Sequence, residues 1–373
     1  MNRKSFLKGI ALGTISLPVA LRLLAGKNYA QSSSHSTQTV SGKRYEWKLV
    51  TTWPPNFPIF GDACTAFSRM VEEMSGGRMT IRVFGGGELV PALEVFDGVR
   101  SGAAEIGHGA AYYWAGKSAA APFFSTVPFG MNAQQSTAWI LSGGGLQLWE
   151  SLYAKFNLIP MLGGNTGVQM GGWFNREINT IADLKGLKMR IPGLGGQVLA
   201  KAGGSPVLMA GGELYTSLER GVIDAAEWVG PYHDMLLGFQ EIAQYYYTPG
   251  WQEPGTAFEF IFNKERFEAL PADLQAILRT AATATHLWCF SEMEMRNSEA
   301  MATLLEKRID IRPFPEEVIA QLRTYTEEVI SEMVANDPFT QKVYESYSAF
   351  QKKAAGYAGI TEKVFYNSLS API

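Results

Sequence analysis

Apolar and polar positions follow two rhythms along the chain. Runs that alternate with a period of two, or that are wholly apolar, predict strands, and stretches with apolar residues three and four apart predict helices. In the first third, the expected strands are residues 45–51, 80–84 and 104–109, and the expected helices are residues 60–75 and 92–101. Strands that alternate with helices predict a mostly parallel sheet with helices on both faces.

A similar rhythm restarts later in the chain and predicts a second α/β unit. Its expected strands are residues 158–162, 169–174, 188–191 and 225–229, and its expected helices are residues 195–202 and 213–220. We assign a strongly apolar strand at residues 256–263 to the first unit again, and a long helical region follows from Pro271 to about Arg308. The chain therefore crosses between two domains more than once, as in proteins whose lobes close about a hinge around a ligand.

These patterns divide the mature chain into two lobes and a helical tail. Lobe I is expected at residues 45–164 and 256–300, lobe II at residues 165–255 and 301–315, and the tail at residues 316–373. The tail carries an aromatic excess at Phe350, Tyr357, Phe365 and Tyr366. Two explanations fit these aromatic residues: a dimer contact, or packing on the chain's own body.

The start of the chain differs from the rest in composition. Arg3, Lys4 and Lys8 precede an apolar stretch, which predicts an export signal at residues 1–30. The opening resembles a twin-arginine signal with lysine in the second place. A membrane anchor is the alternative, but the apolar run is shorter than the ~20 residues that a span needs. A flexible linker rich in Ser, Thr and Gln is expected at residues 31–44.

Charge and motif content exclude several classes of function. The net charge is −3 and the mature part has no basic run, so nucleic acid is excluded as a partner. The sequence has no Walker loop and no G-x-S-x-G elbow, and its four histidines lack the spacing of zinc ligands. Cys64 and Cys289 are the only cysteines, and we expect two buried thiols rather than a disulfide. Binding is therefore favoured over catalysis.

One arginine stands at the end of an expected strand in the second unit. Arg190 ends an expected strand directly before the break at Pro192-Gly193. A guanidinium can hold a carboxylate with two parallel hydrogen bonds, which lysine does less well. The alternative for Arg190 is an ordinary salt bridge on the surface.

Oxygen-bearing side chains gather at the ends of strands in the second unit. Alternation places Gln169 on the same strand face as Trp173, Glu227 ends a strand beside Trp228, and Glu253 follows an aromatic segment. Two carboxylates, an amide oxygen and a backbone carbonyl would form a cage of oxygen ligands. Such ligands suit a hard cation such as Na⁺ or Ca²⁺ rather than zinc.

Three segments carry a family resemblance. Residues 164–174 (GNTGVQMGGWF), 184–190 (LKGLKMR) and 223–231 (IDAAEWVGP) closely resemble the solute-binding proteins of TRAP transporters. The most similar branch binds 2-oxo acids such as pyruvate, or 2-hydroxy acids such as lactate, together with a metal ion. The resemblance extends from about Trp47 to the C-terminal helices. It implies a periplasmic, two-lobed α/β binding fold with a hinge, a long helix across both lobes, and delivery of a small organic acid to a sodium-driven membrane permease.

The resemblance also implies a role for each site residue. Arg190 is the expected carboxylate clamp, with Asn165, Gln169, Trp228 and either Tyr112 or Tyr113 around the acid. The expected cation ligands, for Na⁺ or Ca²⁺, are Gln169, Glu227, the main-chain carbonyl of Trp228, and Glu253. The helical C-terminus implies a homodimer.

The sequence differs from the family at one position of the site, and it leaves two alternative functions open. Gln252 stands where an aromatic residue is expected in this family, which leaves the size of the binding pocket open. A receptor that reports to a sensor partner is the first alternative function. A lyase or hydrolase that uses Glu227 and Glu253 as general acid and base is the second.

Overall fold

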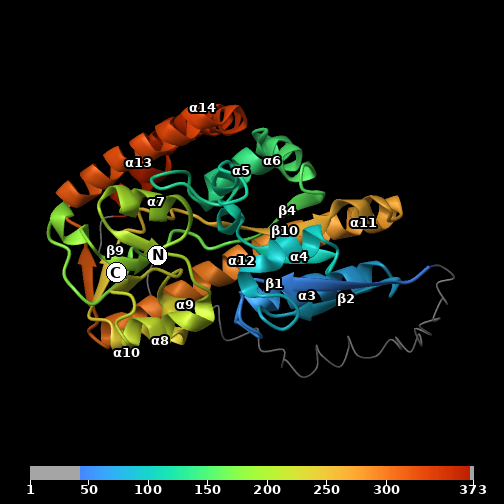
Figure 1. The fold of residues 1–373 in the computed structure, drawn as a ribbon, viewed down its shortest axis with the longest axis horizontal. Coiled ribbons are helices and arrows are strands. Elements are labelled where there is room, and N and C mark those ends of the chain that lie inside the picture. The colour runs from blue at the N-terminus through green and yellow to red at the C-terminus, as the bar shows by residue number, and fades with distance from the viewer. Residues whose placement is uncertain (1–42, 370–373) are drawn as a thin grey trace, which may run out of the picture. The chain divides into compact units, whose positions relative to one another are not determined.

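The computed structural model describes residues 43–369 (Figure 1), which belong to one compact unit. The predicted export signal and nearly all of the predicted linker lie outside the described residues. Among residues 43–369, no helix is both long and apolar enough to cross a membrane.

Lobe I is built on a sheet of five strands. In spatial order these are β2 (Met79–Phe84), β1 (Tyr45–Thr51), β3 (Ile106–Gly109), β10 (Ala257–Asn263) and β4 (Leu158–Asn165). β1 pairs in parallel with β2 and β3, but β10 runs antiparallel to both β3 and β4. The expected mostly parallel sheet is therefore mixed, because β10 enters directly from the other lobe rather than through a helical crossover.

Helices cover both faces of this sheet, as the alternating pattern predicts. On one face α3 (Phe60–Met74) and α12 (Ala272–Glu306) pack over Phe260 and Phe262. The opposite face carries α4 (Val95–Arg100), α5 (Ala133–Ser142) and α6 (Gly145–Ala154) against Ile261 and Leu162. Every residue of β10 is buried, because successive side chains point into two different apolar layers.

Lobe II is built on a second mixed sheet, of six strands. In spatial order these are β11 (Asp310–Pro313), β9 (Tyr245–Thr248), β5 (Gly172–Phe174), β8 (Ala225–Ala226), β6 (Lys188–Arg190) and β7 (Ser205–Val207). Its helices are α7 (Gly193–Lys201), α8 (Leu214–Glu219), α9 (Pro231–Leu236) and α10 (Phe239–Ile242). Figure 1 shows these helices around the sheet that contains β9.

Three segments join the lobes, and two of them are hydrogen-bonded to each other. Residues 166–171 lead from β4 to β5, and residues 249–256 lead back from β9 to β10. The backbone N–H of Thr166 donates to the carbonyl of Thr256 (3.1 Å), and that of Gln169 donates to the carbonyl of Glu253 (3.2 Å). The third connection is α12, which packs against α3 and β4 in lobe I and against α9 in lobe II.

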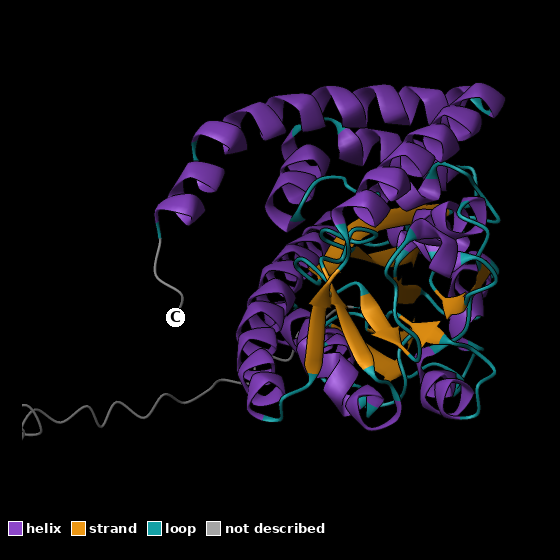
Figure 2. Cartoon of the chain, turned by 90° about the vertical axis from the view of Figure 1, so that its left-hand side faces the viewer, coloured by secondary structure: helices purple, strands orange, loops and turns teal. Residues whose placement is uncertain are grey.

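The C-terminal helices lie along one edge of both lobes. α13 (Glu316–Asn336) packs on α7, and α14 (Pro338–Ile360) packs on α5 and α6. Asp337 caps α14 by accepting from the backbone N–H of Thr340 (3.0 Å), and Pro338 occupies the first helical position. Beyond α6, the end of α14 and the short helix α15 (Glu362–Ser368) extend away from the body (Figure 2).

Two strands of lobe II are shorter than the sequence predicts. The strand expected at 169–174 begins only at Gly172, whose φ of 113° interrupts the extended run, so Gln169 lies in a crossing segment. The strand expected at 225–229 ends at Ala226. The helix expected at 92–101 begins as a 3₁₀ turn at Ala92–Glu94 before α4.

The close approach of the two crossing segments yields a stability prediction. A Cβ added to Gly250 would lie 2.2 Å from the carbonyl oxygen of Gln169. We expect Gly250→Ala to lower the free energy of unfolding by about 2 kcal/mol or more, because the backbones must separate. Urea denaturation measures this change. Gly212→Ala is the matched control, since a Cβ there meets no atom within 4 Å; equal stability of the two variants would contradict the prediction.

Candidate functional site

The predicted site residues all come from the hinge and the facing ends of the two lobes. Asn165 ends β4, while Gln169 and Glu253 lie on the two crossing segments. Arg190 ends β6, and Glu227 and Trp228 directly follow β8. Tyr112 belongs to the 3₁₀ turn Ala111–Trp114 of lobe I. All seven side chains are buried.

Strand pairing brings the first two charged groups together. β6 and β8 are parallel neighbours, with Arg190 opposite Ala226. Residues at the carboxyl ends of parallel strands meet at one edge of the sheet, where α/β folds bind ligands. The backbone N–H of Glu227 donates to the carbonyl of Arg190 (3.2 Å), which extends the pairing one residue beyond β8.

Arg190 is fixed on one side, and its buried Nε has no hydrogen-bond partner within residues 43–369. Its Nη1 donates to the carbonyl oxygen of Glu227 (2.6 Å) and forms an ion pair with the Glu227 carboxylate. The guanidinium carbon lies 4.8 Å from the centre of the Trp228 ring, a cation–π distance. Arg190 is 1% exposed, so the alternative of a surface salt bridge is wrong.

Gln169 and Glu253 form a second polar centre on the hinge. The Nε2 of Gln169 donates to the Glu253 carboxylate (2.7 Å) and to the hydroxyl oxygens of Thr166 and Thr256 (3.2 Å each). The hydroxyl of Thr256 also donates to Glu253. With its amide nitrogen turned to Glu253, Gln169 holds its carbonyl oxygen free of these contacts.

Several buried polar atoms of this site have no hydrogen-bond partner within residues 43–369. The donors are Arg190 Nε, Asn165 Nδ2 and Trp228 Nε1, and the acceptors are Gln169 Oε1, Glu227 Oε2 and Gln252 Oε1. A buried polar atom without a partner costs ~1–3 kcal/mol, so such atoms are few in folded proteins. An anion could accept hydrogen bonds from these donors, and a cation could be held by these acceptors.

The electrostatics of the site point the same way. Burial raises the pKa of Glu253 to about 7. Burial, and then the charge of Glu253, raise the pKa of Glu227 well above its ordinary value, although Arg190 acts in the opposite direction. Burial therefore opposes ionisation of both carboxyl groups, and the Arg190 guanidinium favours it. In the part of the chain that the structure describes, no three His, Cys, Asp or Glu side chains cluster as metal ligands, so a cation here would need Gln169 and a backbone carbonyl as well.

Both candidate tyrosines face the charged groups. The rings of Tyr112 and Tyr113 lie 4.8 Å apart in an edge-to-face arrangement. Burial raises the pKa of both hydroxyls, and the charges of Arg190, Glu227 and Glu253 act on both. Lobe I thus places two aromatic side chains near the charged groups. The sequence predicted that only one of the two tyrosines would lie there.

Sequence reasoning missed the hydroxyls of Thr166 and Thr256, and it named Gln252 only for its effect on pocket size. Thr166 and Thr256 share the amide of Gln169, and Gln252 donates from Nε2 to the carbonyl oxygen of Met170 (2.9 Å). Thr256 stands three residues after Glu253, a spacing that gave no signal because the pair lies in an irregular segment. The two cysteines are buried and free, as expected.

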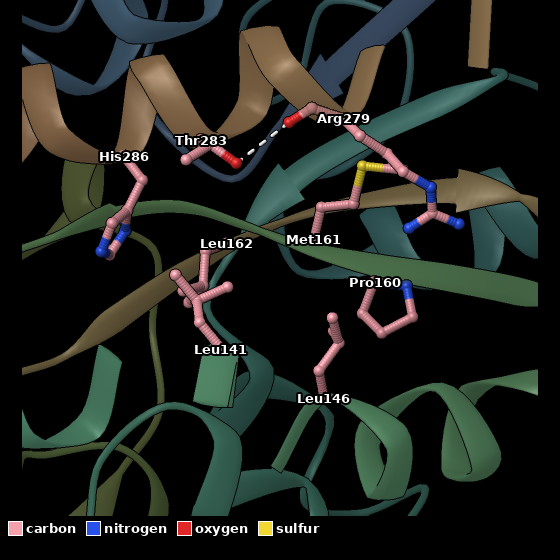
Figure 3. A pocket seen from close by; sticks show the side chains of 8 residues that line it. All are labelled: Leu141, Leu146, Pro160, Met161, Leu162, Arg279, Thr283 and His286. Carbon is pink, nitrogen blue, oxygen red and sulfur yellow. Dashed lines mark hydrogen bonds between the residues drawn. The ribbon is translucent and has the colours of Figure 1, made fainter. Parts of the chain in front are cut away.

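A separate pocket lies away from these residues, on lobe I (Figure 3). Its volume is about 130 Å³, and it lies between α5, α6, β4 and α12. It is lined by Leu141, Leu146, Pro160, Met161, Leu162, Arg279, Thr283 and His286. None of the predicted site residues lines it, and its mainly apolar wall lacks the acceptors that a cation needs.

Comparison with known proteins assigns a family. Residues 49–337 match the family "Bacterial extracellular solute-binding protein, family 7". The chain is 39% identical over 371 residues to the "Monocarboxylate 2-oxoacid-binding periplasmic protein" of Nostoc sp., with 100% of each chain covered.

Two solved structures are similar over nearly their whole lengths. One is a TRAP periplasmic solute-binding protein from Colwellia psychrerythraea with bound calcium and pyruvate (44% identity, TM-score 0.86, 87% of this chain and 100% of that chain covered). The other comes from Pseudoalteromonas atlantica and has bound sodium and pyruvate (45% identity, TM-score 0.86, 87% and 99% covered).

These matches confirm the expected fold and the binding role. The proteins of this family are substrate-binding receptors of transporters, so the enzymatic alternative built on Glu227 and Glu253 is wrong. The chain belongs to family 7 of the bacterial extracellular solute-binding proteins, the solute-binding proteins of TRAP transporters.

Proposed function

We propose that this protein captures a 2-oxo or 2-hydroxy monocarboxylate, with pyruvate as the reference ligand, together with a bridging Na⁺ or Ca²⁺. The observation that carries the proposal is the set of unpartnered donors and acceptors around Arg190 and Glu227. Support comes also from the two similar proteins crystallised with pyruvate and either cation. The acid is then delivered from the periplasm to a membrane permease.

The donors suit the acid. Arg190 Nε, Asn165 Nδ2 and Trp228 Nε1 are buried N–H groups without partners in residues 43–369. In our proposal Arg190 holds the carboxylate, and Asn165, Trp228 and the two tyrosines surround the rest of the molecule. A charge-assisted hydrogen bond from a buried guanidinium is among the strongest that a protein forms with a carboxylate.

The acceptors suit the cation. In our proposal its ligands are Gln169 Oε1, Glu227 Oε2, a carboxylate oxygen of Glu253 and the main-chain carbonyl of Trp228. The cation also touches the carboxylate and the 2-oxo or 2-hydroxy oxygen of the acid. Its charge offsets the repulsion that an incoming carboxylate would meet from Glu227 and Glu253 in a poorly hydrated cleft.

The first prediction is that acid binding depends on the cation and on Arg190. In calorimetric titrations of chelator-treated protein lacking residues 1–30, pyruvate should bind tightly with Na⁺ or Ca²⁺ and at least ~100-fold more weakly without either. Arg190→Lys keeps the charge but loses the planar fork, and should weaken binding by a similar factor. Binding that is tight without a cation would remove the bridging ion, and binding unchanged in Arg190→Lys would remove the clamp.

The second prediction compares a buried glutamate proposed as a cation ligand, Glu253, with a buried glutamate outside the site, Glu259. Glu253→Gln should weaken cation and acid binding together, because it removes one negative charge and replaces an oxygen ligand with an amide. The matched control is Glu259→Gln on β10, a buried glutamate that accepts from Trp114 Nε1 (2.6 Å) and Tyr153 Oη (3.0 Å) outside the site. The control should keep the wild-type affinity and cation requirement; loss of acid affinity alone in Glu253→Gln would argue against a shared site.

We further propose that two copies of the chain form a homodimer through the C-terminal helices. Tyr357, Phe365 and Tyr366 are 66%, 58% and 70% exposed, so these three do not pack on the chain's own body, whereas Phe350 is partly buried and packs against the hydrophobic core. On α12, Leu287 and Trp288 are also exposed. Because the last helices extend beyond the body (Figure 2), a second copy could cover both apolar surfaces.

The third prediction tests this dimer. Phe365→Asp combined with Tyr366→Asp should convert a dimer to a monomer in sedimentation equilibrium, because charges are expensive in an apolar contact. Asn367→Asp, on the same helix, is the control for added charge and should stay dimeric. A wild-type protein that is monomeric at micromolar concentration, or a double variant that stays dimeric, would contradict the proposal.

A further inference from the structure

A histidine of lobe II inserts into lobe I beside the candidate site. His233 lies on α9 and is 0% exposed. Its Nε2 lies 2.9 Å from the carbonyl oxygen of Pro58, which belongs to the loop between β1 and α3. This contact joins the two lobes directly, outside the three segments that connect them in sequence.

Lobe I receives this ring in an aromatic cage. Phe57 stacks on the imidazole with ring centres 4.9 Å apart and planes inclined by 19°, and Phe60 lies 4.3 Å from it. The loop around Pro58 is held in a defined shape. Ile59 has a φ of 63°, and its backbone N–H donates to the Asp62 carboxylate (2.9 Å). The carbonyl of Pro58 is thereby presented to lobe II.

The same segment of lobe II carries the proposed ligands. Glu227 and Trp228 precede His233 by six and five positions, and the intervening turn is short. The Trp228 ring meets Phe57 edge-on at 6.1 Å and Trp53 at 6.4 Å. Movement of residues 227–233 toward lobe I therefore seats both the Trp228 ring and the His233 ring against the same aromatic loop.

We propose that His233 is a closure latch: its neutral imidazole donates to the Pro58 carbonyl only when the lobes close, and so contributes to affinity without touching the ligand. The inference rests on the proposed function, because closure is measured through acid binding. His233 is a positioning residue in this proposal, since it acts through the placement of Glu227 and Trp228.

The hydrogen bond fixes the protonation state that the latch needs. A carbonyl oxygen only accepts, so Nε2 carries the proton and Nδ1 is the bare nitrogen, which has no partner within residues 43–369. A second proton on Nδ1 would place an unpaired N–H and a charge inside the aromatic cage. Burial correspondingly lowers the pKa of His233 to about 4.

Ionisable side chains nearby do not compensate that charge. On the elements packed around His233 they include Asp62 on α3, Tyr232 and Asp234 on α9, Glu241 on α10, and Glu292, Arg296 and Glu299 on α12. Within the described residues none of them hydrogen-bonds to the imidazole. Asp62 accepts from Ile59, Asp234 accepts from Trp173, Tyr246 and Val229, and Arg296 pairs with Glu292 and Glu299.

The direction of the resulting pH effect follows from linkage. In the open form the imidazole is expected to titrate near its ordinary pKa of about 6.5, whereas in the closed form the pKa is lowered to about 4. The closed form binds fewer protons, so affinity is complete above about pH 6.5 and falls as the pH drops toward 4. At about pH 5.5 the latch alone accounts for a roughly tenfold loss of affinity.

Two substitutions separate the hydrogen bond from the charge. His233→Phe keeps an aromatic ring but loses the donor, and should weaken pyruvate binding about fivefold at about pH 7.5, the effect of one ordinary hydrogen bond. His233→Gln can still donate to Pro58 and carries no titrating group. It should bind nearly as well as wild type at about pH 7.5 and should lack the additional tenfold loss at about pH 5.5.

The measurement is calorimetric titration of pyruvate at saturating cation across this pH range, with apo thermal stability recorded for each variant. His286→Gln is the control for any buried histidine, because His286 lies within lobe I on the Gly164 carbonyl (3.0 Å); it should keep the wild-type pH profile. If wild type binds and His233→Gln titrates as wild type does, or if His233→Phe loses apo stability but no affinity, the latch is overturned. If wild type does not bind pyruvate, the proposed function fails instead.

Discussion

The binding site depends on one constraint: charged side chains are buried there, and their lost hydration must be replaced by interactions with other groups. Arg190 is buried against Glu227 and its backbone carbonyl, with Glu253 near enough to raise the pKa of Glu227. A buried ion pair repays its loss of hydration only when the remaining charges and polar atoms are also satisfied. Here the protein supplies two carboxyl groups and one guanidinium. Arg190, Glu227 and Gln169 each keep a buried polar atom that has no hydrogen-bond partner within residues 43–369. In the proposed function an anion and a cation together would complete the arrangement, and either alone would leave it unbalanced.

The same constraint explains why the ligands come from the hinge. Gln169 and Glu253 lie on the two segments that cross between the lobes, and those segments are hydrogen-bonded to each other. A cation held there would be in contact with the backbone that bends when the lobes move. Arg190 and Glu227 come from the edge of lobe II, and Tyr112 from the facing edge of lobe I. In the proposed function, ligand binding and lobe closure would therefore be coupled by position alone.

The positions of Arg190 and Glu227 at strand ends could be predicted from the pattern, and the carboxyl ends of neighbouring parallel strands meet at one edge of a sheet. The pattern alone favoured a surface salt bridge for Arg190, and the clamp role came from the family resemblance. Gln169 was assigned to a strand because its segment alternates, but Gly172 interrupts that strand, and its position depends instead on pairing with residues 249–256. The antiparallel direction of β10, the hydroxyls of Thr166 and Thr256, and the contact of His233 with Pro58 all depend on segments far apart in the sequence. No local periodicity records such contacts.

A comparison of two buried glutamates shows what makes a carboxyl group a ligand in this fold. Glu259 lies in lobe I among apolar side chains, accepts from Trp114 and Tyr153, and burial raises its pKa to about 8, so at neutral pH it is largely an uncharged polar anchor. Glu253 is equally buried, but Arg190, Thr256 and Gln169 all lower its pKa, which stands at about 7. The pKa values of the two glutamates therefore differ little. A cation bound at the hinge, as proposed, would favour the ionised forms of Glu253 and Glu227, which lie there, over that of Glu259, which does not. Burial is the largest influence on both glutamates, and what distinguishes Glu253 is its surroundings: the Thr256 hydroxyl, the Arg190 charge and the Gln169 amide all lower its pKa, whereas Glu259 has only the hydrogen bonds from Trp114 and Tyr153.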